Sequence, residues 1–217
     1  DISSEERQWL EQHGIFKLGV DPAWAPFEFV DEKGAYSGIG SSYVDMVGSR
    51  LGITMTPQSG LSWTEIMDQA KTGDIDIIPT IARTPEREKF LNFSNPYMSF
   101  PMVITTRNDA TFTDGLDSLA GKKVGVVDGY VTQELIGANH KDLIVVAVKN
   151  LAEGLRQLNE GKIDAFVDNL VTITYELHKS SLTNLRIASP TKYRFELAMG
   201  VRKDLPELIP ILNKALE

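Results

Sequence analysis

The chain has 217 residues, of which 42% are hydrophobic, and its formal net charge at pH 7 is −8. The acidic balance and the lack of a tract rich in Lys and Arg argue against a nucleic-acid partner, and the absence of cysteine excludes disulfide and thiol chemistry. No apolar stretch is long enough to cross a bilayer, and no signal peptide is recognisable. The sequence starts abruptly and stops inside a helical pattern, so we expect a mature fragment of a longer protein.

Helices and strands alternate along the first part of the chain. A short capped helix is predicted after Ser3 and Ser4, with its end at Gly14, and apolar residues at helical spacing predict a second helix over residues 39–51 that ends at Gly52. Alternating patterns predict short strands over residues 16–20 and 53–58. A capping box, described below, opens a further helix after the second strand.

The loop that follows the first predicted strand contains Pro22 and Pro26, with Trp24 between them. A tryptophan held between prolines belongs either to a core or to the wall of a ligand pocket, and both interpretations stay open. Two carboxylates, Asp21 and Glu28, flank this tryptophan. They lie either at the mouth of a pocket or on a solvated loop.

The stretch of residues 74–97 is the one around which the chain is organised. Its β-branched run over residues 75–78 predicts a buried strand, and Thr84 followed by Pro85 predicts a helix start with Thr84 as the N-cap. N–H groups at a helix start attract anions, and Arg87 in the first turn can hold a carboxylate through two parallel hydrogen bonds. The alternative is that Arg87 is one of the solvated charges of a mixed-charge run. The local sequence alone slightly favours that alternative.

A helix followed by Gly-x-Ile-Asp and a strand occurs twice, with the motif at residues 73–76 and 161–164. The first of these helices begins with a capping box of Ser62 and Glu65. Two such units predict two similar lobes with mostly parallel α/β sheets, whose ligands bind beyond the carboxyl ends of the strands. This rule selects Pro79, Thr80 and Ala82 in one lobe, and Asp168 and Asn169 in the other.

Two extended runs, over residues 100–106 and 195–201, are expected to cross between the lobes as a two-strand hinge. Residues 185–188 are expected to form a separate short strand, and a helix over residues 206–216 is expected to cover the first lobe. The predicted lobes are therefore discontinuous, with residues 1–103 and 198–217 in lobe 1 and residues 104–197 in lobe 2.

The order and spacing of these motifs resemble the bacterial extracellular solute-binding proteins of family 3, which bind amino acids and related small polar molecules. The resemblance covers essentially the whole chain and rests on residues 20–27, Gly38, Trp63, and residues 73–77, 84–87, 93–97, 119–122 and 161–165. It implies an α/β type II periplasmic-binding-protein fold, in which two α/β lobes joined by a two-strand hinge close around a ligand like a Venus flytrap.

The resemblance also assigns roles to residues of the first lobe. Trp24 and Trp63 match the two aromatic positions that enclose the ligand side chain, and Arg87 matches the carboxylate-binding arginine. Thr80 and Ala82 match positions that donate hydrogen bonds to the ligand, although Ala82 offers only its backbone N–H.

The second lobe departs from the family pattern. Tyr130 and Val131 stand where the family usually has small hydroxyl residues at a helix N-terminus, and Asn169 stands where amino-acid binders have the aspartate that holds the ammonium group. Asp168 is its neighbour, but adjacent strand residues point to opposite faces, which argues against a simple replacement. The resemblance therefore implies a small carboxylate or amino-acid-like ligand, with the carboxylate half of the site intact and the amine half altered.

Residues 2–14 and 190–216 resemble, more narrowly, the sensor domains that precede the membrane segment of bacterial histidine kinases and diguanylate cyclases. This narrower resemblance implies a periplasmic domain that closes around its ligand and signals to a membrane-bound kinase or cyclase, with a dimer within the receptor as the expected assembly. The solute-binding component of an amino-acid ABC transporter is the first alternative.

Catalysis is the second alternative, because some relatives of this fold are cyclohexadienyl-dehydratase-like enzymes that act on small carboxylates. The three histidines, His13, His140 and His178, fall in predicted turns or on helix surfaces and are expected to be solvated. No nucleophile elbow, phosphate loop or metal-spaced ligand set is present. We therefore expect no catalytic residue, no metal and no cofactor in this domain.

Overall fold

The computed structural model describes all 217 residues. Its helices are α1 (Ser4–His13), α2 (Ile39–Leu51), α3 (Trp63–Thr72), α4 (Pro85–Glu88), the 3-10 helix η1 (Leu116–Leu119), α5 (Val131–Asn139), α6 (Leu151–Asn159), α7 (Leu170–Lys179) and α8 (Leu208–Leu216). Its strands are β1 (Ile15–Leu18), β2 (Ala23–Trp24), β3 (Glu28–Val30), β4 (Tyr36–Ser37), β5 (Thr54–Pro57), β6 (Ile77–Ala82), β7 (Leu91–Phe93), β8 (Met98–Arg107), β9 (Lys123–Val127), β10 (Ile144–Val148), β11 (Ala165–Asn169) and β12 (Leu185–Arg202). None of the helices combines the length and the apolar character needed to cross a membrane.

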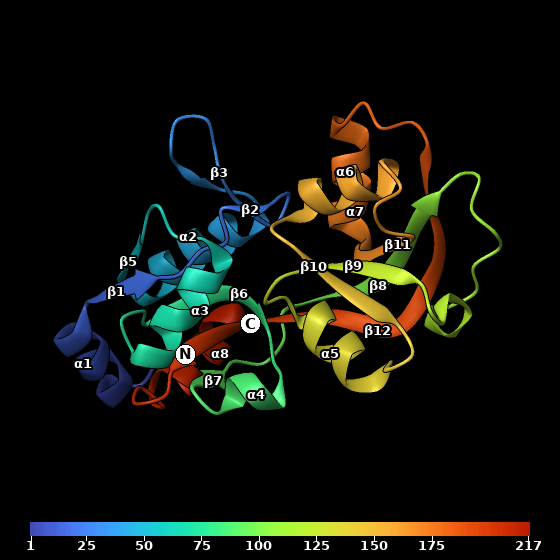
Figure 1. Ribbon diagram of the computed structural model, residues 1–217. Coiled ribbons are helices and arrows are strands. Elements are labelled where there is room, and N and C mark those ends of the chain that lie inside the picture. Colours follow the sequence, from blue (N-terminus) through green and yellow to red (C-terminus); the bar gives the residue numbers. More distant parts are fainter. The chain divides into compact units, whose positions relative to one another are not determined.

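The chain divides into two compact units, whose elements can be followed in Figure 1. Unit 1 contains Asp1–Ala23, Phe27–Met98 and Glu196–Glu217, and unit 2 contains Trp24–Pro26 and Ser99–Phe195. Apart from the short segment Trp24–Pro26, the chain passes between the units at the start of β8 and in the middle of β12. Whether these two strands bend as a hinge remains a prediction about motion.

The sheet of unit 1 has the strand order β5-β1-β6-β12, and β7 pairs with β12. Helices α1, α2 and α8 pack with β1 in one apolar cluster that includes Phe16 and Leu18, whereas α3 packs in a second cluster around Ile66. Strand β6 contributes Ile77 to the first cluster and Ile78 to the second. Because successive strand residues point to opposite faces, the two clusters cover the two faces of the sheet.

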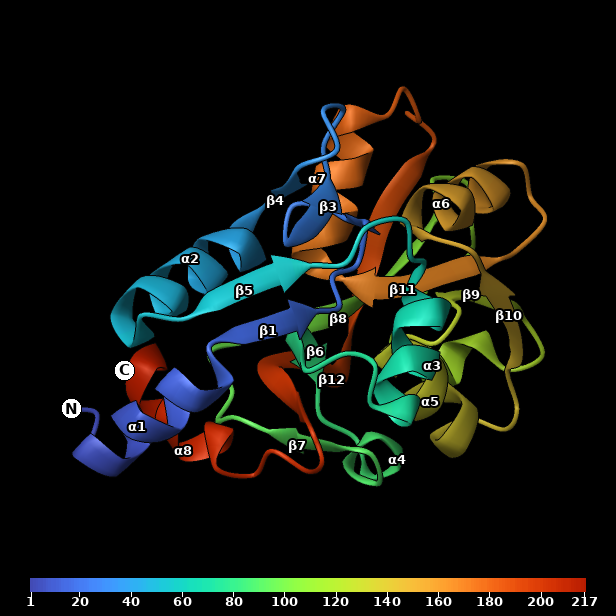
Figure 2. The ribbon, with the colours of Figure 1, turned by 90° about the vertical axis from the view of Figure 1, so that its left-hand side faces the viewer.

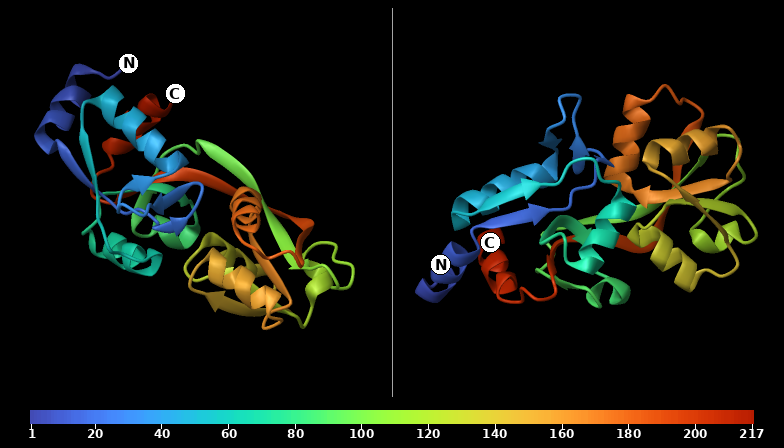
Figure 3. Two further views of the ribbon diagram at one scale, coloured as in Figure 1. Left: turned by 90° about the horizontal axis from the view of Figure 1, so that it is seen from above. Right: turned by 60° about the vertical axis from the view of Figure 1, so that its left-hand side comes forward.

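The predicted helix starts in unit 1 are confirmed. Ser62 and Glu65 form the capping box of α3, and Ser3 with Glu6 forms an equivalent box at α1. Figure 2 shows α1 and α8 side by side, and a salt bridge of 2.8 Å between Lys214 and Glu6 joins them. Both chain termini therefore lie at the same end of unit 1 (Figure 3).

The sheet of unit 2 has the order β10-β9-β11-β8, followed by the first part of β12. Helices α6 and α7 lie on one face and α5 on the other (Figures 1 and 3). Phe166 of β11 is fully buried against α6, and a Cβ atom built on Gly154 would lie 2.2 Å from its ring. Only glycine leaves room for the aromatic ring at this point of α6.

The two Gly-x-Ile-Asp motifs form the same joint in the two units. In unit 1, the Asp76 carboxylate accepts a hydrogen bond of 2.7 Å from the Lys17 N–H, and the Asp76 N–H donates to the Lys17 carbonyl oxygen at 3.0 Å. In unit 2, Asp164 makes the same two bonds with Lys123, at 2.9 and 2.8 Å. Each motif therefore joins the strand that follows it to an earlier parallel strand of its sheet, which is β1 in unit 1 and β9 in unit 2.

An arginine at the end of a long strand completes each joint. Arg202, the last residue of β12, pairs with Asp76 at 2.9 Å. Arg107, the last residue of β8, lies 4.0 Å from Asp164 and donates to two backbone carbonyl oxygens of unit 2 at 2.7 and 2.8 Å. Each long strand is thus fixed at its far end to the unit that it enters.

Two expectations about the strands need correction. Residues 185–188 and 195–201 belong to one continuous strand, β12, of 18 residues. The exposed residues Pro190, Lys192 and Arg194 in its middle interrupt the hydrophobic pattern, so the pattern alone divides it. The second expectation is that the sheets are mostly parallel. Strands β5, β1 and β6 pair in parallel, as do β10, β9 and β11. The two long strands pair antiparallel, β8 with β11 and β12 with β6.

Candidate functional site

Arg87 is a buried cation at the end of β6 in unit 1, with only 3% of its surface exposed. Its Nη1 donates a hydrogen bond of 2.8 Å to the Ala82 carbonyl oxygen, and its guanidinium lies 5.9 Å from the centre of the Trp63 ring. The Thr84 hydroxyl accepts the Arg87 N–H at 3.2 Å, as predicted for an N-cap. The interpretation of Arg87 as a solvated charge is therefore wrong. A guanidinium fixed in this way is suited to binding a carboxylate.

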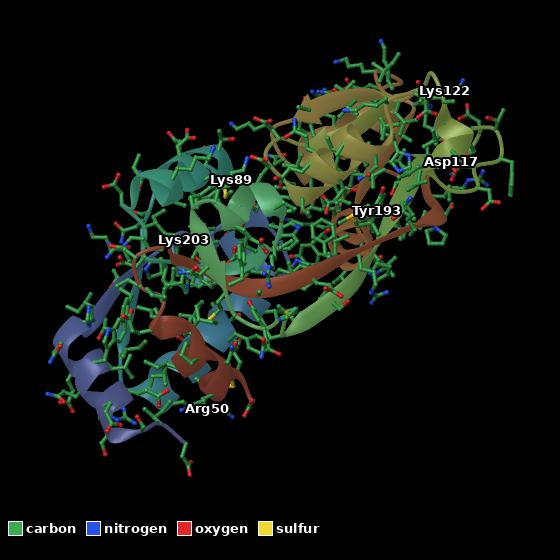
Figure 4. The ribbon with its side chains drawn as sticks, turned by 90° about the horizontal axis from the view of Figure 1, so that it is seen from below. Arg50, Lys89, Asp117, Lys122, Tyr193 and Lys203 are labelled. Atoms are coloured by element: carbon green, nitrogen blue, oxygen red, sulfur yellow. The ribbon has the colours of Figure 1, made fainter.

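The helix start at which an anion site is predicted opens only a single turn of four residues, α4, and the anion site itself stays a prediction. Pro85 has no N–H, and the N–H groups of Arg87 and Glu88 already donate to Thr84. One turn also has too few aligned peptide groups to build a macrodipole. We therefore expect Arg87 itself to provide most of the attraction for an anion at this turn. Lys203, labelled in Figure 4, ties this turn to the segment after β12 by donating to the Glu88 carbonyl oxygen at 2.7 Å.

The other candidate residues of unit 1 lie near the carboxyl ends of β1 and β6. Trp63 begins α3 and is half-buried against its core, and Ala82 ends β6 with 7% of its surface exposed. Thr80 is buried, and its hydroxyl lies 3.3 Å from the Tyr97 Oη. Asp21 is buried too, so the interpretation that places this carboxylate on a solvated loop is wrong.

Glu28 of β3 is fully buried, and the solvated-loop interpretation is wrong for this residue as well. Its carboxyl oxygens accept hydrogen bonds from the Tyr36 hydroxyl at 2.8 Å and from the Asp21 N–H at 3.1 Å. Burial raises the pKa of the Glu28 carboxyl to about 8; the Asp21 charge acts in the same direction, and the hydrogen bonds act against both. Burial and the nearby Glu28 raise the pKa of Tyr36 as well. At neutral pH, Glu28 is therefore mostly a neutral carboxylic acid.

Trp24 packs in an aromatic cluster of unit 2, with 5% of its surface exposed. Its ring meets the Tyr130 ring edge-on at 5.9 Å between centroids and lies 5.7 Å from the Phe195 ring. Edge-on and tilted aromatic pairs of this kind stabilise the arrangement of the rings. Trp24 is thus held beside Tyr130, which precedes α5.

The N-terminus of α5 carries two of the candidate residues. Tyr130 occupies the N-cap position, but its side chain makes no capping hydrogen bond. Val131, 4% exposed, is the first helical residue. Thr132 follows, and its fully buried hydroxyl oxygen has no hydrogen-bond partner. Thr132 was missed by the sequence analysis. Its signal was a hydroxyl residue in the first turn after a glycine turn, one position beyond the two residues selected from the resemblance.

Asp168 and Asn169 end β11, and both are fully buried. The Asn169 Oδ1 accepts the Val171 N–H at 2.8 Å and caps α7, while its Nδ2 has no hydrogen-bond partner. The Asp168 Oδ1 accepts the Asn169 N–H at 2.6 Å and lies 3.5 Å from the Thr172 hydroxyl, which donates to it. Asn169 therefore keeps a spare donor, whereas this oxygen of Asp168 is engaged within the first turn of α7.

The histidines do not form a catalytic group. His13 and His178 are exposed, but His140 is 8% exposed, so the expectation that it is solvated is wrong. Its Nε2 lies 3.0 Å from the Tyr193 hydroxyl and its Nδ1 lies 3.7 Å from the Asp117 carboxylate, two residues labelled in Figure 4. His140 and Asp117 also line a pocket of about 150 Å³ in unit 2. No cluster of three or more His, Asp or Glu residues could hold a metal ion.

Comparison with known proteins gives a consistent result. Residues 16–217 match the model of the bacterial extracellular solute-binding proteins, family 3. The virulence sensor protein BvgS of Bordetella pertussis is 28% identical over 215 residues, which cover 99% of this chain and 17% of BvgS. The L-cystine-binding protein TcyJ of Escherichia coli is 25% identical over 211 residues, which cover 95% of this chain and 78% of TcyJ. The crystal structure of the BvgS periplasmic VFT2 domain matches with a TM-score of 0.88 and 28% identity, covering 100% of this chain and 92% of that domain.

These similarities confirm the predicted α/β type II periplasmic-binding-protein fold. They also confirm the prediction of a non-catalytic binding domain with a small-molecule ligand, because the matching proteins are sensor and solute-binding domains. The chain spans 17% of the length of the sensor protein that it matches. With the matched region extending from residue 16 to the last residue, the chain belongs to the bacterial extracellular solute-binding proteins, family 3.

Proposed function

We propose that the chain is the ligand-binding sensor domain of a longer membrane protein and that it binds a small solute bearing a carboxylate. Arg87 carries this proposal. It is a buried guanidinium, held by the Ala82 carbonyl oxygen and placed against the Trp63 ring, in a family that binds solutes. Full-length alignment with one domain of the sensor BvgS supports the sensor role.

The domain is proposed to lie in the periplasm and to signal to a membrane-bound kinase or cyclase, as a dimer within the receptor. The similarity to an L-cystine-binding protein favours a second candidate, the binding component of an amino-acid transporter. The coding sequence beyond Glu217 separates the two. A transmembrane segment followed by a kinase or cyclase region supports the sensor, whereas a stop codon within a few residues overturns it.

We expect the preferred ligand to be a small carboxylate whose amine is absent or secondary. Asn169 offers a neutral amide with a spare donor, which cannot neutralise an ammonium group as an aspartate does, and a buried unpaired ammonium is costly. A thermal-shift panel of α-amino acids against matched keto, hydroxy and dicarboxylic acids measures this. The acids without an amine are expected to give the larger stabilisation, and Asn169→Asp is expected to shift the preference towards α-amino acids.

The matched control for this panel is Asn139→Asp, which makes the same charge change at an exposed position of α5. It is expected to leave the ligand preference unchanged. The ligand class proposed here is wrong if a common α-amino acid stabilises the wild type most and Asn169→Asp does not strengthen its effect.

The segments 100–106 and 195–201 are proposed to act as a hinge about which the two units close on the ligand. Closure is driven by the higher affinity of the ligand for the closed state. Small-angle scattering is expected to show a smaller radius of gyration at saturating ligand than without it, and Arg87→Ala is expected to show no change at the same ligand concentration. Equal radii for free and saturated wild type would contradict the hinge.

A further inference from the structure

We propose that Glu28 is a positioning residue of the proposed binding site: its buried carboxyl fixes the two segments that leave β1 and β6, and it stabilises the fold most while it carries a proton. The proposal rests on the proposed function for the location of the site at this edge of the sheet. Its physical content, a protonated carboxyl that holds two strand exits, is independent of which ligand binds.

The position of Glu28 follows from the strand order of unit 1. Strands β1 and β6 are neighbours, with Leu18 opposite Ile77, so their carboxyl ends open at the same edge. Asp21 follows β1, and its N–H donates to the Glu28 Oε2 at 3.1 Å. Thr80, near the end of β6, lies beside the same carboxyl, and its hydroxyl acts to lower the pKa of Glu28. One side chain from β3 therefore holds both exits.

Helix α2 encloses this carboxyl. A Cβ atom built on Gly40 would lie 2.7 Å from the Thr80 Oγ1, 2.9 Å from the Tyr36 Oη and 3.0 Å from the Glu28 Cγ. The three groups thus converge against the backbone of α2, at a place where only glycine fits. Because Glu28 is fully buried, the enclosure keeps its carboxyl away from bulk water.

No positive charge compensates Glu28 among the titratable groups that face it. These groups are Asp21 from the segment after β1, Tyr36 from β4 and Tyr97 from the segment after β7, with Tyr43 of α2 beyond Tyr97, and all of them are acids. A buried carboxylate without a cation is costly, so the neutral form is stabilised. When the proton is lost, the buried charge has no cation to compensate it, so the folded state that holds the two strand exits loses stability.

The pH dependence of stability follows from the proton balance. The Glu28 carboxyl has a pKa of about 8 in the folded chain against 4.5 for its ordinary value, so between these pH values the folded chain binds more protons than the unfolded chain. The stabilisation is therefore complete below about pH 4.5 and is lost as the pH rises to about 8. From pH 5.5 to 8.5, the Tm of the wild type is expected to fall by roughly 5–10 °C relative to that of Glu28→Gln.

Glu28→Gln is the informative variant, because glutamine keeps the shape of the protonated acid and cannot ionise. Glu32→Gln is the matched control, since Glu32 is an exposed carboxylate in the turn that follows β3. The control is expected to follow the wild-type pH profile. Parallel Tm profiles of the wild type and Glu28→Gln over this pH range would overturn the proposal, because they would leave no role for the proton of Glu28.

A measurement on the unchanged chain covers the case in which Glu28→Gln does not fold. In carboxyl-labelled glutamate NMR, one signal is expected to titrate near pH 8, and the proposal fails if every glutamate titrates below about pH 5.5. Both experiments are done without ligand, so their outcome is separate from that of the ligand panel. If the Tm profiles are parallel and the ligand panel gives the expected preference, only the role of Glu28 is refuted. If the Tm profiles diverge as expected and the panel favours α-amino acids, only the ligand class is refuted.

Discussion

Replacing Arg87 with alanine is expected to reduce ligand affinity roughly 30- to 5,000-fold, which corresponds to the loss of about 2–5 kcal/mol when one partner of a desolvated charge pair is removed. The guanidinium is 3% exposed, so water cannot take over its role for a bound carboxylate. Isothermal titration calorimetry with the most stabilising acid of the panel measures the effect, and circular dichroism reports whether the fold is intact.

Arg83→Ala is the matched control for this prediction. Arg83 is four residues away, its side chain is 65% exposed, and it forms an ion pair with Glu88. Exposed pairs of this kind contribute little to stability, so this variant is expected to bind as the wild type does. Arg87→Lys is expected to recover only part of the affinity, because an ammonium cannot form the two parallel hydrogen bonds of a guanidinium. Unchanged affinity in Arg87→Ala would refute the role of Arg87 as the carboxylate anchor.

The second large effect is expected in the core of unit 2, where Phe166 packs against Gly154. Truncation of the fully buried ring by Phe166→Ala is expected to lower the free energy of unfolding by about 3–5 kcal/mol. Gly154→Ala is expected to lower it by about 1–3 kcal/mol, because its Cβ would lie 2.2 Å from the ring. Denaturant unfolding followed by circular dichroism measures both changes.

Combining the two substitutions tests the contact directly. The double variant is expected to be more stable than the sum of the single effects predicts, because the alanine methyl group at position 154 enters space that the Phe166 ring has left. Gly137→Ala serves as the control, since nothing lies within 4 Å of a Cβ atom at this position of α5 and alanine favours a helix. Strict additivity of the two substitutions would mean that Gly154 is not required by the ring.

Features of the fold that depend on residues close together in the sequence could be predicted from the sequence alone. The capping box at Ser62 could be predicted because its two partners, Ser62 and Glu65, lie three residues apart in the sequence. The placement of Thr80 was not readable, because the pairing of β6 with β12 shifts register between Ala198 and Gly200. From the alternation along β6 alone, one could not predict that Thr80 faces Tyr97 and Glu28. The register shift is set by the pairing with the partner strand, which the local sequence of β6 does not contain.

In the candidate site, too, residues identified by nearby sequence were predicted, whereas those placed by contacts with other segments were not. Arg87 stood out because its cap and its family motif are contiguous in sequence, and the structure adds that it is buried. Glu28 and His140 are polar residues in segments that local sequence assigns to solvent. Only distant residues bury them, Tyr36 and Thr80 in the first case and Tyr193 in the second. Which of the candidate residues contact a ligand stays a prediction.

The hydrogen bond from Lys203 to Glu88 connects α4 to the segment between β12 and α8. Lys203 follows directly after Arg202, which is pinned to Asp76 at 2.9 Å, and its ammonium holds the Glu88 carbonyl oxygen one residue beyond Arg87. Five residues further along the chain, α8 begins at Leu208. A small displacement of the turn that carries Arg87 would therefore act on the segment between Arg202, which is held by Asp76, and the start of α8. If Arg87 holds the ligand carboxylate as proposed, Lys203 links the turn that carries it to the segment that leads into α8.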